Sequence, residues 1–132
     1  MFLNNHLDVR TIDGRKDTLL HPLTYKDSLG RLWRAKKYSF TDGLSIPSFI
    51  SWIPGFAPNG DDDWWSGVLH DAFYHGTAQI KEGKHWVDYT APKRVADWVL
   101  RDALKSQGVG CLRRNLIYYA VRLFGWSSYR PD

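Results

Sequence analysis

The residue pattern changes once along the chain, from short β-prone runs to longer amphipathic segments. Between residues 6 and 40, the runs HLDVRTI, TLLHPLTYKD and RLWRAKKYSF are separated by the turn signals Asp13-Gly14 and Ser28-Leu29-Gly30. From about residue 62, apolar side chains recur at helical spacing instead. The pattern predicts an α+β fold, with an N-terminal antiparallel β-meander within residues 1–41 and a three-helix half within residues 47–126.

Long helices are predicted at residues 62–74, 92–105 and 112–124, and a short one at residues 48–53. Gly76 and Gly108 follow the first two long segments and are typical helix stops. Residues 81–89 are polar and interrupted by glycine, so we expect a surface excursion of variable conformation there. The last helix carries an apolar stripe, which consists of Leu112, Leu116, Tyr119, Ala120 and Leu123.

Length and cysteine content restrict the possible sites. The 132 residues suit one domain covering 1–132, and 20 aromatic residues supply ample material for a core. Cys111 is the single cysteine, so an intramolecular disulfide and a multi-cysteine zinc site are both excluded. No apolar run approaches the ~20 residues of a membrane span, and no secretion signal opens the chain, so we expect synthesis in the cytoplasm without a Sec route.

The charges are distributed unevenly. Residues 38–80 contain no Lys or Arg but five Asp, within a chain of net charge +4. Such a segment suggests a site built around a cation or a proton transfer. Apart from the adjacent Arg113 and Arg114, most basic residues are scattered among acids, which argues against nucleic acid as a partner.

The string Val68-Leu69-His70-Asp71-Ala72-Phe73-Tyr74 carries the strongest local chemistry. On a helix, His70 and Tyr74 share a face, whereas Asp71 points about 100° away. Imidazole suits a general base or metal ligand, and Asp71 or Asp97 could orient its second nitrogen. The alternative is a buried histidine that only makes structural hydrogen bonds.

Two further segments supply candidate site residues. Asp42 and Ser45 follow the last predicted strand and could present a carboxylate and a hydroxyl to one cavity, or simply close a turn and cap a helix. No Gly-x-Ser-x-Gly elbow surrounds Ser45, which weakens its case as a nucleophile. Asp97 interrupts an apolar helical stretch, so it either faces solvent beside Arg94 and Arg101 or turns inward toward His70.

The order of these motifs resembles a family of tailed bacteriophages and prophages, domain of unknown function 1353. The matching strings are Phe40-Thr41-Asp42-Gly43-Leu44-Ser45-Ile46-Pro47, the His70 string, Ala96-Asp97, and Tyr119-Ala120-Val121-Arg122-Leu123-Phe124-Gly125. The resemblance covers about residues 38–126 and implies a phage origin. It groups Asp42, Ser45, His70, Asp71 and Asp97 as a polar signature without bringing an established activity.

The His-Asp-x-x-Tyr string is also similar to the His-Asp helix of secreted phospholipases A2, in which His is the base and the adjacent Asp holds calcium. The disulfides and the glycine-rich calcium loop of those enzymes are missing here.

We therefore expect a phage tail or baseplate protein with a His/Asp hydrolase-like site that acts on the host envelope. His70, Asp97, Ser45 and Tyr74 would be its catalytic candidates, with Asp42 and Asp71 as ligands of a divalent cation. Other virion proteins would be its partners, and the virion tail its location. The alternative is a purely structural tail component whose His/Asp cluster is a buried hydrogen-bond network.

Overall fold

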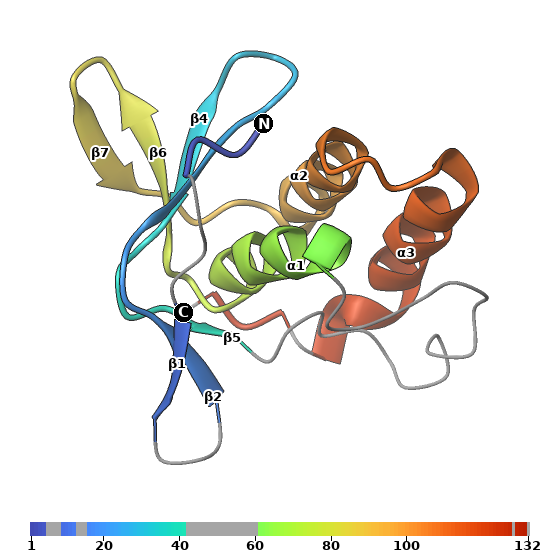
Figure 1. Cartoon of the computed structure of the whole chain (residues 1–132), viewed down its shortest axis with the longest axis horizontal. Coiled ribbons are helices and arrows are strands. Elements are labelled where there is room, and N and C mark those ends of the chain that lie inside the picture. The colour runs from blue at the N-terminus through green and yellow to red at the C-terminus, as the bar shows by residue number, and fades with distance from the viewer. Residues whose placement is uncertain (5–8, 13–15, 42–60, 128, 132) are drawn as a thin grey trace.

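Strands and helices occupy opposite sides of the molecule (Figure 1). The computed structural model describes residues 1–4, 9–12, 16–41, 61–127 and 129–131. Within these residues, antiparallel strands are followed by three long helices, and two more strands lie between the first and second helix. The predicted α+β class with an N-terminal antiparallel sheet and three helices is confirmed.

The strands form two antiparallel sheets. One has the order β1-β2-β5, with β1 at Val9–Ile12, β2 at Lys16–Leu19 and β5 at Phe40–Thr41. The other has the order β3-β4-β6-β7, with β3 at Leu23–Lys26, β4 at Leu32–Ala35, β6 at Ala78–Glu82 and β7 at His85–Asp88. The predicted run at residues 18–27 is split between the sheets, and its break contains Pro22, which has no N–H to donate to a ladder.

The helices stack outward from the sheets. Helix α1 (Asp61–Tyr74) packs on β4, β5 and β6, α2 (Lys93–Ser106) packs on α1, and α3 (Cys111–Phe124) packs on α2 before the short 3₁₀ turn η2 (Gly125–Ser127). These bounds lie within one residue of the predicted ones. None of the described helices is both long and apolar enough to cross a lipid bilayer.

Two apolar clusters hold these layers together. The larger joins the sheets to α1 and α2 around Trp33, which packs edge-on against Phe73 with 5.2 Å between ring centroids. The smaller lies between α2 and α3 and consists of Leu100, Leu104, Val109, Ile117 and Val121. Helix α1 is buried from Ser66 to Tyr74, so any polar residue in this stretch needs a partner inside the protein.

Two predictions about local structure are wrong. Residues 81–89 are not irregular, because most of them belong to the β6–β7 hairpin, whose turn contains Gly83 at a φ of 62°. The predicted stripe of α3 does not face the core either: Leu112 is 76% exposed and Leu123 is 69% exposed, and only Ala120 of the five is buried. Ile117 and Val121, from the neighbouring face, contact α2 instead.

Candidate functional site

His70 and Tyr74 lie one helical turn apart on α1 and face α2. Their ring centroids are 4.0 Å apart, and both side chains are almost completely buried, with His70 only 1% exposed. The spacing of four residues places them on the same face of the helix, as the sequence predicted. The helix therefore presents an imidazole and a phenol side by side to the next layer.

Both of these side chains hydrogen-bond to one carboxylate oxygen of Asp97 on α2. His70 Nε2 lies 2.9 Å from Asp97 Oδ1, and the Tyr74 hydroxyl donates to the same oxygen at 2.5 Å. Asp97 is 0% exposed. Of the two orientations open from the sequence, the inward one is observed, and Arg94 and Arg101 are not the residues that neutralise this carboxylate.

The second oxygen of Asp97 binds two cations. Lys93 Nζ donates to Oδ2 at 2.8 Å, and Arg122 Nη1 donates to the same oxygen at 3.1 Å. Lys93 is itself 4% exposed and also donates to the carbonyl of Val121 at 2.5 Å. Because Val121 lies in the last turn of α3, the ammonium also meets the negative end of that helix.

These contacts determine the protonation of Asp97. Burial by itself would raise the pKa of its carboxyl, but the hydrogen bond and charge interaction with His70, followed by the hydrogen bonds of Lys93 and Tyr74, outweigh it and lower the pKa to about 2. Burial, and then the hydrogen bond to Asp97, raise the pKa of Tyr74, so its hydroxyl stays a donor. Asp97 is thus ionised at neutral pH and accepts hydrogen bonds only.

The ionised carboxylate fixes the tautomer of His70. Since Asp97 can only accept, Nε2 of His70 must carry the hydrogen that they share. Whenever the ring is neutral, its lone pair is therefore on Nδ1, to which no side chain in the described part of the protein donates a hydrogen bond. This arrangement orients a base, and it equally satisfies a buried histidine.

The other predicted site residues are placed less completely. Asp71 is buried on α1 and its backbone carbonyl accepts from the N–H of His75. Asp42, Ser45 and the short helix at 48–53 lie outside the described residues. Among the residues that are described, no group of three or more His, Cys, Asp or Glu could hold a metal ion, and the proposed Asp42–Asp71 ligand pair cannot be assessed from Asp71 alone.

Lys93 and Arg122 were not predicted as part of this cluster. Lys93 had a signal in the sequence, because Lys93, Asp97, Leu100 and Leu104 share one helical face and two of them are apolar. That spacing places the two charges on the core side of α2. Arg122 had no such signal, since it reaches Asp97 only through the packing of α3 on α2.

Comparison with known proteins provides a family assignment. The model of the family described as "Protein of unknown function (DUF1353)" matches residues 17–121, which include every described member of the Asp97 cluster except Arg122. No curated protein and no solved structure matches the chain. Because the match covers most of the 132 residues, the chain belongs to the DUF1353 family.

Proposed function

We propose that the protein is a hydrolase in which His70 is the general base and Asp97 orients it. The observation that carries the proposal is the contact of His70 Nε2 with a carboxylate that is buried, ionised and held by three other donors. A base needs a fixed ring and a second nitrogen that can take a proton; this contact supplies the first, and no described side chain donates to Nδ1.

The reaction follows from this arrangement. Nδ1 of His70 takes a proton from a water molecule whose oxygen attacks an ester, amide or phosphoryl centre, and the resulting imidazolium is stabilised by Asp97. The imidazolium then returns the proton to the leaving group as that bond breaks. Tyr74, Lys93 and Arg122 act by holding Asp97 in place. Since His70 is 1% exposed, turnover requires that the surroundings of Nδ1 open to admit water and substrate.

The proposal includes a divalent cation, with Asp42 and Asp71 as its ligands. Such an ion would polarise the oxygen of the scissile group. The test is thermal unfolding with calcium, zinc, manganese or magnesium, for the wild type beside Asp42→Asn and Asp71→Asn. Stabilisation by one metal that both substitutions remove is the expected result, and equal midpoints with and without every metal would exclude the cation.

The biological setting that we propose is the tail or baseplate of a bacteriophage, with the host envelope as substrate. Its support is the resemblance of the ordered motifs to a phage and prophage family. Mass spectrometry of purified virions tests this setting, and we expect the protein in tail fractions. Its detection only in infected-cell lysate would contradict a virion role while leaving the hydrolase proposal standing.

A structural role is the second candidate, and burial favours it. His70 and Asp97 are 1% and 0% exposed, and the carboxylate is fully satisfied by donors from three helices. A network of this kind can fix the packing of α1, α2 and α3 without any chemistry. In that case the protein would be a tail component whose cluster only holds the helices together.

The substitution His70→Gln separates the two roles. The amide nitrogen of Gln can take the place of Nε2 and still donate to Asp97, but it cannot take a proton, so the hydrolase proposal predicts that turnover of ester, amide or phosphodiester substrates falls ~100-fold or more. The unfolding midpoint should change little. Wild-type protein that turns over none of the three substrate classes, with a His70→Gln variant that is only less stable, would favour the structural role.

A further inference from the structure

A row of basic residues with one Trp lies on the face of α2 that adjoins the buried face. Arg94, Trp98, Arg101 and Lys105 recur at spacings of four, three and four, whereas Lys93 and Asp97 lie on the buried face. Arg101 and Lys105 are like charges one turn apart, an arrangement that weakens a helix. These side chains are half-buried or exposed. A ligand of opposite charge would offset that weakening.

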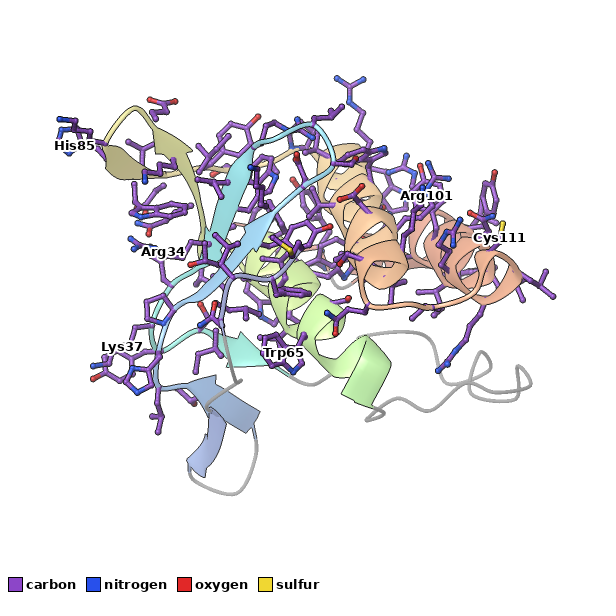
Figure 2. The ribbon with its side chains drawn as sticks, turned by 45° about the horizontal axis from the view of Figure 1, so that its top comes forward. Arg34, Lys37, Trp65, His85, Arg101 and Cys111 are labelled. Carbon is purple, nitrogen blue, oxygen red and sulfur yellow. The ribbon has the colours of Figure 1, made fainter. Side chains whose placement is uncertain are left out.

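These residues line two pockets that adjoin at Trp98. The first, about 280 Å³, is polar and contains Arg101, Lys105 and Arg114 together with Asn115. The second, about 320 Å³, is walled by Val95, Trp98 and Tyr118, with Arg31 and Arg94 at its rim. Figure 2 shows Arg101 in the region between α2 and α3. We call the two adjoining pockets, one cationic and one aromatic, the α2–α3 groove.

Three of the five basic residues of the α2–α3 groove are held by neighbouring groups. The guanidinium of Arg101 stacks 4.1 Å from the ring centroid of Tyr118, and that of Arg31 lies 5.3 Å from the centroid of Trp98. Arg114 donates to the carbonyl of Val109 at 3.2 Å. Because these side chains are already oriented, a ligand would lose little affinity to ordering them.

Positive charge dominates the groove. Among the described residues, it is lined by five cations, Arg31, Arg94, Arg101, Lys105 and Arg114, and by one acid, Asp102. Oδ2 of Asp102 is already engaged, because it accepts from the Tyr25 hydroxyl at 2.5 Å and from the Ser28 N–H at 3.1 Å. Asp27 lies nearby and pairs with Arg31. The remaining excess of positive charge favours an anionic ligand.

We propose that the α2–α3 groove binds a phosphate monoester that carries a planar ring, the chemistry of a mononucleotide. Arg101, Lys105 and Arg114 would hold the phosphate, since guanidinium forks and ammonium groups match its oxygens. The ring would stack in the second pocket against Trp98 or Tyr118, where Arg94 lies at the rim. The groove is separate from the His70 site, so this binding does not depend on hydrolase activity.

Calorimetric titration with adenosine monophosphate tests the proposal, with adenosine, inorganic phosphate and hexyl phosphate as partial probes. The monophosphate should bind more tightly than each of the three. Arg101→Gln should weaken its binding ~10-fold or more, as expected for the loss of a charged contact. Arg94→Gln, at an exposed position, should weaken it as well. Lys84→Gln, in the exposed β6–β7 turn, and His70→Gln should leave binding unchanged.

Several outcomes would overturn the proposal. Inorganic phosphate that binds as tightly as the monophosphate would show that the aromatic pocket is not used. Tighter binding of hexyl phosphate would assign the groove to a lipid-like phosphate instead. The proposal would be refuted if the folded wild-type protein did not bind the monophosphate. It would also be refuted if Arg101→Gln and Arg94→Gln bound it as tightly as the wild type. Shifts of the Trp98 and Arg101 side-chain N–H resonances must accompany binding, and their absence would place the ligand elsewhere.

Discussion

Asp97→Asn replaces the carboxylate on which four hydrogen-bond donors converge, while keeping nearly the same volume. The amide oxygen can still accept from Lys93 and Arg122, and the amide nitrogen would then face Tyr74 and His70. Both of these can become acceptors, but His70 does so only by moving its hydrogen to Nδ1. The variant therefore keeps the hydrogen bonds, loses the negative charge and holds the imidazole in the tautomer that cannot act as a base.

Two estimates give the cost in stability. Removing one partner of a buried ion pair typically costs 3–5 kcal/mol, and the lower end, about 3 kcal/mol, applies because the hydrogen bonds survive and Lys93 still reaches the Val121 carbonyl. The lowering of the Asp97 pKa from 3.8 to about 2 corresponds to about 2 kcal/mol in favour of the ionised form. Both estimates predict a fall of about 10 °C in the unfolding midpoint.

Calorimetry or circular dichroism measures this midpoint at neutral pH, with Asp88→Asn as the matched control. Asp88 is also contacted by a cation and an amide, those of Lys36 and Gln79, but it is exposed on the hairpin. The unfolding midpoint of Asp88→Asn should therefore equal that of the wild type. An Asp97→Asn midpoint equal to that of the wild type would refute the reasoning, because a buried carboxylate between two cations cannot be neutralised without cost.

Three further predictions concern the same cluster and the end of α1. Because the pKa of Asp97 is lowered in the folded state, its contribution to stability is present above pH 3.8 and is lost as the pH falls toward 2. Over this range the free energy of unfolding of the wild type should fall by about 2 kcal/mol more than that of Asp97→Asn. Gly125→Ala places a methyl 2.7 Å from the Tyr74 hydroxyl, so we expect about 1–3 kcal/mol of destabilisation by urea titration, and an unchanged midpoint would contradict the packing. Gly76→Ala adds a carbon 1.9 Å from the Pro131 carbonyl oxygen at a φ of +75°, so the C-terminal residues should be displaced and become open to proteolysis. Equal protection of these residues in the wild type and in Gly76→Ala would disprove the contact.

The sequence predicted the elements that depend on local patterns. The three long helices were found because apolar spacing and glycine stops are properties of each segment, and the pairing of His70 with Tyr74 follows from helix geometry alone. The β6–β7 hairpin was not predicted, although its two-residue turn, Gly83-Lys84, begins with a glycine, which is a recognisable hairpin signal. The prediction for residues 81–89 was wrong because a polar, glycine-containing segment can form an exposed hairpin as well as an irregular loop.

The remaining features depend on how the helices pack. Helix α3 has apolar residues on two neighbouring faces, and only contact with α2 decides that Ile117 and Val121 are buried while Leu116 is exposed. The ion pair of Arg122 with Asp97 likewise joins two helices across a contact that no spacing within either one predicts. Such choices between equivalent faces require the tertiary structure.

Turnover by wild-type protein and by His70→Gln, measured on ester, amide and phosphodiester substrates, tests the central claim most directly. The claim is that His70, oriented through Nε2 by Asp97, removes a proton from water at Nδ1. It predicts hydrolysis of at least one substrate class by the wild type and a loss of ~100-fold or more in His70→Gln, with the fold intact in both proteins. Equal turnover in both proteins, or none in the wild type, would contradict it.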